Sequence, residues 1–442
     1  MGGKMVPAPL ELKANWDTPI GEGREIRYPY GLAVRAAAAD RATYPSRCPT
    51  TLSPRASIVT APTQQFTTAV PTPTHVAAVL PPQEPVRFPL SWLLENAAPP
   101  IQCRAINEVV KLGGAAAEAA QKLPYSYPPA LLLAIGQATD GTWNRSMLGI
   151  PSARAEHFEG IGTVNAFRRL VEYGWDKDSP PLAHARRVLF RLLAEDDDPS
   201  YLFELAGKGT PDVDTVLRGR ALLREAAAAA LAQAGYESDP RLRGAARRIM
   251  ERIATYLRSP LAEKPFIRIA NQHALAPEAV PPSFHTLQML AHMPLFRSEN
   301  YEILELLYAY LTQPLPRTEP AQLIGKKIVP APQLVLGDML PHRNAADADV
   351  PFALVWLELM ARLGFLRRNE NWNKLFERFL DDRDERGVWH PHKGLAAARS
   401  ANPFVWSYFP LENTMVGEER WADATFRLGL IARYAGRPIE VV

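Results

Sequence analysis

The chain has 442 residues, enough for two or three average domains or for one large helical domain, and its hydrophobic fraction of 47% can supply a large core. Its 50 lysines and arginines against 47 acidic residues give a net charge of +3, and the basic residues are spread along the chain, so we expect neither a nucleic acid nor another polyanion as a partner. The two cysteines, Cys48 and Cys103, argue against a disulfide framework and against a zinc site built on thiolates. No apolar run approaches the roughly 20 residues that span a bilayer, so we expect a cytoplasmic protein without a transmembrane segment.

Residues 1–89 differ in composition from the rest of the chain. Sixteen of the 42 prolines lie in residues 1–100, and Thr, Pro and Val are mixed there without helical periodicity. We predict an extended Pro-rich arm over residues 1–89, which is either a disordered tail or a segment ordered by the protein's own body or by a neighbouring subunit. Through this arm we expect self-association or a protein partner.

Residues 90–442 form the second predicted domain, in which helix, short turn and helix alternate. Apolar residues recur at helical spacing on both sides of Pro99 and Pro100, which predicts a first helical hairpin. Two later segments, 284–311 and 352–380, show the same pattern. Strands are predicted to be scarce throughout.

An internal repeat appears when the chain is slid by 61 positions, so that residues 174–193 lie on residues 235–254 without a gap. Gly174 and Gly235 allow the left-handed turn that ends a helix, while Asp178 or Asp239 stands where the next helix needs an N-cap. The matched arginines fall on the polar face of that next helix. They are Arg186, Arg187 and Arg191 in the first copy and Arg247, Arg248 and Arg252 in the second.

The two helices of each pair differ in polarity. Residues 352–360, "FALVWLELM", are apolar nearly all round, whereas residues 369–380, "NENWNKLFERFL", carry polar residues at regular intervals. A helix that is apolar on all faces is enclosed, and a helix with one apolar stripe belongs to an outer layer. We therefore predict an all-α fold of stacked helical hairpins with inner and outer helices, either a closed α/α toroid or an open solenoid.

Residues 137–143, "QATDGTW", resemble the QW-type repeat motif of the terpenoid cyclase and protein prenyltransferase α/α-toroid superfamily. Residues 381–389, "DDRDERGVW", look like a second copy that lacks the glutamine, and "WLLENAAPP" is similar to the lead-in of bacterial prenyltransferase-like proteins of unassigned activity. The resemblance covers about residues 90–442. It implies an α/α toroid in which the motif's Gln ties a helix end and its Trp stacks on that end.

The catalytic signatures of this superfamily are not evident in the sequence. The acidic stretches at 195–198, 347–349 and 381–384 do not form the DxDD motif of the cyclases, and no Asp, Cys and His set matches the zinc site of the prenyltransferases. His390 and His392 form a His-x-His pair without an evident third ligand, and we interpret them as loop histidines rather than a metal site. No Gly-rich phosphate loop follows a strand, so we expect no cofactor.

One geometric inference concerns the starts of the inner helices. In a toroid these helices run in one direction, so acidic and imidazole side chains at their N-termini gather around one mouth, where they form an acid/base pair, bind a polar substrate or simply cap the helices. The candidate residues are Glu156, His157, His285, Asp347, Asp349 and Asp423. The aromatic residues Phe352, Trp356, Trp406, Tyr408 and Phe409 either line a cavity for a hydrophobic small molecule or fill the core.

Two functional hypotheses remain. The first is a binding or assembly protein on a terpenoid cyclase-like toroid, without the usual catalysis of the superfamily. The second is an enzyme that acts in the mouth of the toroid, either a terpenoid cyclase-like isomerase or a carbohydrate-active enzyme with paired carboxylates.

Overall fold

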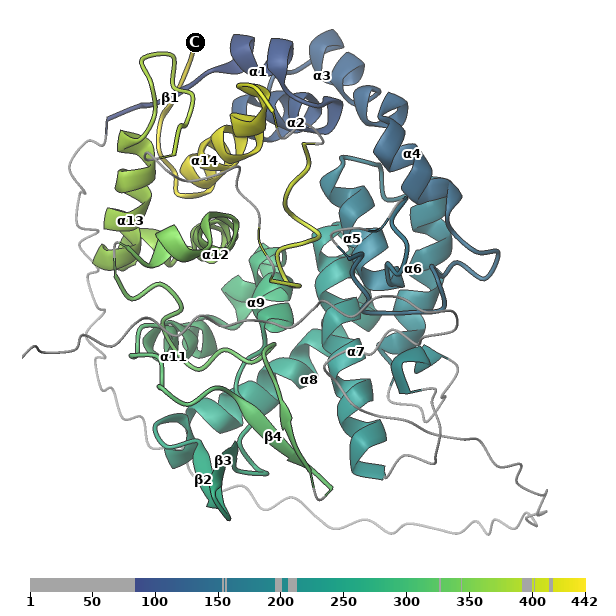
Figure 1. Ribbon diagram of the computed structural model, residues 1–442, viewed down its shortest axis with the longest axis vertical. Helices are drawn as coiled ribbons and strands as arrows, with labels where there is room; N and C mark the ends of the chain where they lie inside the picture. The colour runs from purple at the N-terminus through teal and green to yellow at the C-terminus, as the bar shows by residue number, and fades with distance from the viewer. Residues whose placement is uncertain are drawn as a thin grey trace, which may run out of the picture. The chain divides into compact units, whose positions relative to one another are not determined.

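The computed structural model describes residues 84–152, 155, 157–194, 201–205, 213–325, 327–342, 344–391, 400, 402–412 and 416–442. Nearly all of the predicted arm therefore lies outside the described residues, and its extended conformation and its partners remain predictions. The described residues are rich in helices, and Figure 1 shows how these are arranged.

Some helices are buried on every side, as the sequence predicted. These inner helices are α5 (Thr163–Glu172), the C-terminal half of α7 (Val213–Gln233), α9 (Phe284–Ala291), α12 (Val350–Arg362) and α14 (Ala422–Tyr434). Each packs on the next in this order, and α14 then packs on α2 (Pro99–Arg104) and on its π-helical continuation η1 (Ala105–Val110). The prediction that residues 352–360 form an enclosed helix is confirmed, because every residue of α12 except Arg362 is buried.

A second set of helices presents one face to the inner helices and the other to solvent. These outer helices are α4 (Pro128–Ile135), α6 (Pro180–Leu192), α8 (Pro240–Leu257), α11 (Tyr301–Leu311) and α13 (Glu370–Asp381). Three short helices complete the set, namely α1 (Leu90–Asn96), α3 (Ala115–Ala120) and α10 (Pro294–Glu299). The alternation of helices and turns predicted over 284–311 and 352–380 is confirmed, with α9, α10 and α11 in the first segment and α12 and α13 in the second.

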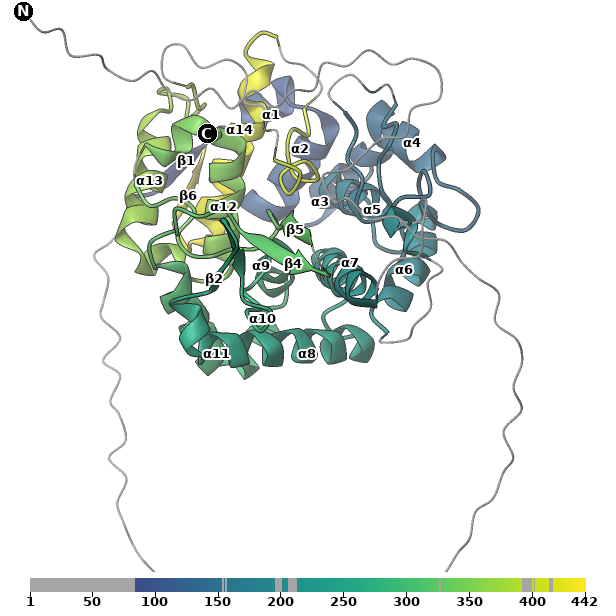
Figure 2. The same cartoon turned by 60° about the horizontal axis from the view of Figure 1, so that its bottom comes forward.

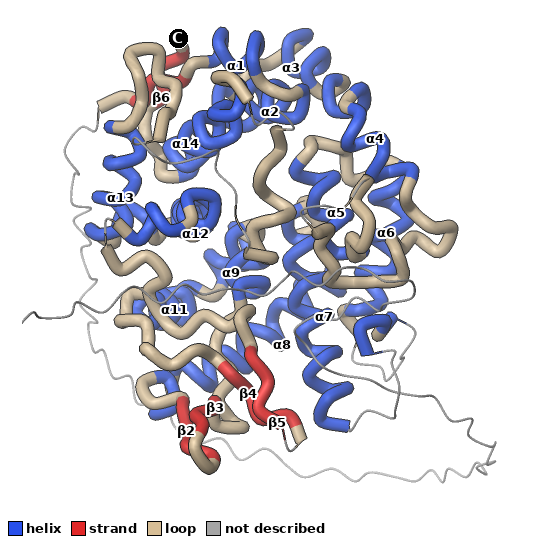
Figure 3. The backbone as a smooth tube through the Cα atoms, viewed as in Figure 1, coloured by secondary structure: helices blue, strands red, loops and turns tan. Residues whose placement is uncertain are grey.

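The prediction of an all-α fold needs a correction, because the described residues also contain six short strands (Figure 3). Four of them form one sheet in the order β2, β3, β4, β5, and in Figure 2 this sheet lies in front of α9. Its strands are β2 (Phe266–Ile269), β3 (Gln272–Leu275), β4 (Ala321–Ile324) and β5 (Lys327–Pro330). Each antiparallel hairpin follows an outer helix, and β3 joins β4 in parallel. Four-residue strands give too little alternation to be recognised in a sequence.

The second sheet joins the two ends of the described chain. β1 (Val86–Phe88) pairs in parallel with β6 (Ile439–Val441), and Val86 lies opposite Ile439. The side chains of Val86 and Phe88 are buried. These residues fall within the range 1–89 that we assigned to the arm, so the folded part begins before residue 90.

In the repeat of residues 174–193 and 235–254, both predicted glycine turns are confirmed. Of the two predicted N-caps, only the second one is formed. Gly174 and Gly235 have φ values of 86° and 84°, the left-handed conformation that was predicted. Asp239 caps α8 by accepting a hydrogen bond of 2.9 Å from the backbone N–H of Arg241. Asp178 caps nothing, because α6 begins at Pro180 and Ser179 occupies its N-cap position.

The two turns ending in Trp143 and Trp389 share their backbone geometry. Gly141 and Gly387 both have positive φ, and each donates its N–H to the carbonyl three residues earlier. The backbone N–H groups of Trp143 and Trp389 donate to the hydroxyls of Thr163 and Thr425, which lie near the starts of α5 and α14. The two segments at 137 and 381 therefore build equivalent connections into inner helices.

The polar anchors of these two turns differ. The side-chain amide of Gln137 donates to the backbone oxygens of Gly141 and Pro181, at 3.1 and 2.9 Å, and ties the turn to the start of α6. Arg383 holds the corresponding position in the second turn, and its guanidinium donates to the backbone oxygen of Arg87 at 2.7 Å. The second copy therefore has an arginine in the place of the missing glutamine.

Candidate functional site

The space between the inner helices contains a cluster of buried charges. Arg427 of α14 donates to Glu172 of α5 at 2.6 Å and to Glu358 of α12 at 2.7 Å, and all three side chains are buried. Glu358 and Arg427 have only apolar residues as immediate neighbours in the sequence, whereas Glu172 follows Arg168 and Arg169 by one helical turn. Buried ions of opposite sign require one another, because an unpaired charge in a low-dielectric interior is costly.

The cluster extends to α2 and to the far end of α12. Arg104 pairs with both Glu172 and Glu108, and Arg362 pairs with Glu358 at 2.8 Å. Burial alone would raise the pKa of Glu172, but Arg104 and Arg427 outweigh it and hold that pKa well below its usual range. The carboxyl group of Glu172 is therefore ionised and engaged by arginines, which leaves it unsuited to act as a general acid.

Beside this cluster, Arg168 of α5 is buried among neutral partners. Its guanidinium donates to the side chains of Gln233, Gln288 and Tyr408, at 2.7, 2.5 and 2.6 Å. His285 of α9 lies next to Gln288, with 3.3 Å between Nδ1 and Oε1. Burial, together with the charge of Arg168, lowers the pKa of His285 to about 3, so its imidazole is neutral at physiological pH.

Two candidate residues from the sequence, His285 and Asp423, are buried near the starts of inner helices. Asp423 accepts hydrogen bonds from the backbone N–H groups of Leu411 and Glu412, and burial raises its pKa. Its other carboxyl oxygen, Oδ1, has no hydrogen-bond partner within the described residues. Of the six candidates, Asp423 is the one that combines burial with a raised carboxyl pKa.

The other candidates occupy structural or exposed positions. Asp349 caps α12 by accepting from the N–H of Phe352 at 2.9 Å, and it also accepts from the hydroxyl of Ser400. Asp347 pairs with Arg378, and His157 is exposed in a turn. Glu156 lies outside the described residues. No hydrogen bond or ion pair joins any two of the candidates that are described, so the predicted acid/base pair is not formed by direct contact.

The proposed loop histidines also do not assemble a metal centre in the described part of the chain. His390 lies 3.4 Å from Asp384 and packs against the ring of Trp421, while His392 lies outside the described residues. Where the structure describes the chain, no group of three His, Cys, Asp or Glu residues is close enough to hold a metal ion. Nor is any helix there long and apolar enough to cross a membrane.

Two of the aromatic residues that were considered for a cavity, Phe352 and Trp356, stack on each other with 6.3 Å between their ring centroids. Phe352, Trp356 and Phe404 surround the ring of Phe284 at centroid distances of 5.5 to 6.2 Å, and Phe404 also meets His285 edge-on. Trp356 is fully buried. These contacts are those of a filled core.

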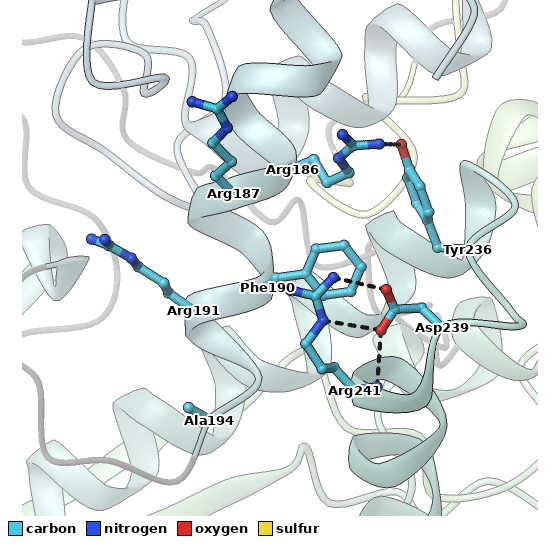
Figure 4. A pocket seen from close by; sticks show the side chains of 8 residues that line it. All are labelled: Arg186, Arg187, Phe190, Arg191, Ala194, Tyr236, Asp239 and Arg241. Carbon is cyan, nitrogen blue, oxygen red and sulfur yellow. Dashed lines mark hydrogen bonds and ion pairs between the residues drawn. The ribbon is translucent and has the colours of Figure 1, made fainter. Parts of the chain in front are cut away.

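A pocket of about 700 Å³ lies instead on the outer helices α6 and α8 (Figure 4). It is lined by Arg186, Arg187, Phe190, Arg191, Ala194, Tyr236, Asp239 and Arg241. The sequence predicted Arg186, Arg187 and Arg191 on the polar face of a helix, and the fold brings Arg241 to the same hollow. The contact between α6 and the start of α8 could not be predicted from the sequence.

Two of the four arginines that line this pocket bind other residues of its lining. Arg241 pairs with Asp239 at 2.8 Å and covers the ring of Phe190, and Arg186 donates to the hydroxyl of Tyr236 at 2.9 Å. Arg187 and Arg191 extend from α6 on the side away from Asp239, as Figure 4 shows. The same figure shows their guanidinium groups pointing in different directions.

Comparisons of this chain with protein-family models, with curated proteins and with solved structures find no match.

Proposed function

We propose that this chain is a binding or assembly protein, built on a terpenoid cyclase-like α/α toroid, that does not carry out the chemistry of that superfamily. Its assembly is an association of copies of the same chain, to which the outer face of α4 and the Pro-rich arm contribute. The ligand or partner is met on the outside of the helices rather than between them.

The closed form of the toroid is supported by contacts between the chain's two ends. β1 pairs with β6, and α14 packs against α1, α2 and η1. Arg104 of α2 also pairs with Glu172 of α5, which links α2 to the first of the inner helices. An open solenoid would leave its first and last hairpins apart, because each repeat contacts only its neighbours.

The assembly role rests mainly on the outer face of α4. Ala130 and Leu133 are buried beneath the helix, but Leu131, Leu132 and Ile135 are 38%, 43% and 79% exposed. The other outer helices carry charged residues on their solvent side, as α6, α8 and α13 do. Large apolar side chains grouped on a solvent-facing helix are typical of a surface that another protein covers.

The proposal that no reaction takes place between the inner helices is supported by the ion pairs of the buried carboxylates. Glu172 and Glu358 are each bound by two arginines, and the aromatic core around Phe284 is packed. A carbohydrate-active enzyme would need two carboxylates in an open groove. The pocket between α6 and α8 is lined by one carboxylate, Asp239, and a second pocket, lined by residues of α7 and α8, also has one, Glu251.

The experiment is native mass spectrometry of the full chain beside the variant Leu132→Glu/Ile135→Glu. We expect the full chain to form a dimer or larger oligomer and the variant to be a monomer, since two carboxylates would have to be desolvated at the interface. The matched control is Val213→Glu/Leu217→Glu, which changes exposed apolar residues on α7 and should keep the oligomer. A full chain that stays monomeric at every concentration, or an oligomer that survives the α4 substitutions, would contradict the proposal.

The alternative is an enzyme, and the observation that favours it is Asp423. A buried carboxyl group with a raised pKa and one free oxygen is what the protonation of an alkene by a cyclase-like isomerase requires. The same mass spectra test this alternative. A small hydrophobic mass that is retained by the wild-type chain and lost from Asp423→Asn would favour the enzyme over the assembly role.

A further inference from the structure

The four-stranded sheet is built from two hairpins that match each other. When the chain is slid by 55 positions, residues 265–276 lie on residues 320–331, and in each copy the first residue, a proline, accepts a hydrogen bond of 2.8 Å from the N–H of the last residue, an alanine. The turn residues Ala270 and Gly325 have positive φ values of 52° and 58°. Because β3 pairs with β4 (Figure 3), the two free edges of the sheet belong to β2 and β5.

The pairing of β2 with β3 determines which backbone groups of β2 face outward. In an antiparallel pair, residues that exchange two hydrogen bonds alternate with residues that exchange none. Ala276 donates to Pro265, so the register places Phe266 and Arg268 at positions that are not bonded to β3. The N–H and C=O groups of these two residues therefore point along the free edge. No strand that the structure describes pairs with them.

The other free edge is protected against an added strand. By the same alternation, Ile328 and Pro330 occupy the outward positions of β5. Proline has no N–H, and Lys327 places a charge on the strand, and both features are common means of protecting an edge. The one charged residue of β2, Arg268, donates its Nε–H to the carbonyl of Ala270 at 3.1 Å. β2 is therefore the edge that can pair fully with an added strand.

The side chains of β2 suit a strand that another strand covers. Phe266 packs against the hydrophobic core, which holds β2 in place, whereas Ile267 is 39% exposed. Three of the four residues of β2 are aromatic or β-branched, and such residues favour strands. An edge strand with an exposed apolar side chain readily pairs with another chain unless it is covered.

The chain contains a segment that is suited to this edge, within the predicted arm. From Pro45 to residue 83, prolines divide the arm into short runs, of which the longest is residues 63–70, "TQQFTTAV". Five of its eight residues are aromatic or β-branched, none is charged, and each has a backbone N–H. The 13 residues that follow it before residue 84 span up to about 45 Å when extended, so the run can leave its own copy and reach a neighbour.

We propose that residues 63–70 of one copy add a strand to the free edge of β2 in a neighbouring copy. This inference rests on the proposed function, because it gives the arm a docking place in the association of copies. The outward N–H and C=O groups of Phe266 and Arg268 bind the added strand, and Ile267 packs against one of its side chains. The contact between α4 faces raises the effective concentration of the arm near β2, so a short edge is sufficient.

The test is hydrogen exchange of the full chain, resolved to single amides, at a concentration at which copies associate. We expect the outward N–H groups of Phe266 and Arg268 to be protected in the wild type and to exchange at least about tenfold faster in Thr67→Pro/Thr68→Pro. Two adjacent prolines remove donors from both sides of the added strand, whichever side faces β2. The matched control, Thr67→Ala/Thr68→Ala, keeps both donors and should exchange like the wild type. The outward N–H of Ile328 on β5 should exchange fast in all three proteins.

A second pair of variants changes β2 itself. Arg268→Pro removes an outward N–H without breaking a bond to β3, so its melting temperature should stay close to that of Arg268→Ala. We expect Arg268→Pro to weaken the association of copies by about fivefold or more, because a hydrogen bond is lost from each docked arm. Arg268→Ala keeps the N–H and should associate like the wild type. Analytical ultracentrifugation measures both dissociation constants.

The outcomes separate this inference from the proposed function. Equal exchange of the β2 amides in the wild type and in Thr67→Pro/Thr68→Pro, in a chain that still forms oligomers, would overturn the docking of the arm and leave the proposed function standing. A full chain that is monomeric at every concentration would refute the association itself. Arm-dependent protection that persists in the Leu132→Glu/Ile135→Glu monomer would overturn the exchange between copies and place the strand on its own copy. Protection that both substitutions abolish supports the proposal.

Discussion

At the scale of single residues, the interior of this protein opposes the protonation of two histidines. His285 and His292 lie on or next to α9, and burial together with a nearby arginine lowers the pKa of each to about 3. In an unfolded chain a histidine has a pKa near 6.5. Between these two values the unfolded state binds more protons than the folded state, so stability is fully present above pH 6.5 and falls as the pH is lowered through that window.

This linkage predicts the effect of His285→Gln. Glutamine cannot be protonated, so the variant should lose about 2 kcal/mol less free energy of unfolding than the wild type when the pH is lowered from 7.5 to 5. The measurement is urea unfolding at the two pH values. From pH 7.5 to 8.5 the two proteins should change in parallel, because neither state is protonated at this position. Equal losses on acidification would mean that His285 is not held neutral in the folded chain.

At the scale of elements, β1 is anchored through a glycine. Gly429 lies in the middle of α14, and a Cβ atom at this position would collide with the ring of Phe88. Because Phe88 is buried and its strand is paired with β6, its ring has little room to move. The contact explains how residues from the predicted arm region belong to the folded part of the chain.

We therefore expect Gly429→Ala to destabilise the protein by about 1–3 kcal/mol, as overpacking does in a filled core. The control is Gly244→Ala on α8, where a Cβ would meet only the end of the Arg248 side chain, at 4.0 Å. This second substitution should stabilise the protein by about 0.5–1 kcal/mol, because alanine favours a helix over glycine. Chemical unfolding of both variants gives the two signs. If Gly429→Ala left the free energy of unfolding unchanged, β1 would not be packed tightly against α14.

The helical hairpins and their polarity could be predicted because they depend on local periodicity. Gly141 and Gly387 likewise indicated turns, and the backbone of both turns has a positive φ at the glycine. What the sequence could not show is which distant groups meet. Glu358 was visible as one charge within "FALVWLELM", but its partner Arg427 lies 69 positions away, and nothing local connects the two. A lone charge inside an otherwise apolar helix is the signal that would have pointed to the buried cluster.

At the scale of the whole molecule, that cluster joins helices from both ends of the described chain. Arg427 of α14 binds Glu172 of α5, although 255 positions separate them, and Arg104 of α2 meets the same carboxylate. The network therefore spans the same contacts that a closed ring of hairpins requires. An open stack has no need for an ion pair between its last helix and one of its first.

Arg427→Met tests both the strength and the reach of this network. Removing one partner leaves Glu172 and Glu358 buried with less compensation, so we expect a loss of about 3–5 kcal/mol in the free energy of unfolding. The control, Arg368→Gln, breaks a pair with Glu305 in which the side chains are 39% and 34% exposed, and it should cost no more than about 1 kcal/mol. The first loss should change little with salt, because the pair is shielded from solvent ions.

The reach of the effect is measured by hydrogen exchange in the same variant. If the hairpins close into a ring, loosening α14 also loosens its neighbours, so residues 99–110 and 350–362 should exchange faster together with α14. In an open stack the first hairpin would be insulated from a defect in the last helix, because stability there is a sum of nearest-neighbour terms. Faster exchange that is confined to residues 422–434 would therefore argue against a closed toroid, and a joint response of α2, η1, α12 and α14 would support one.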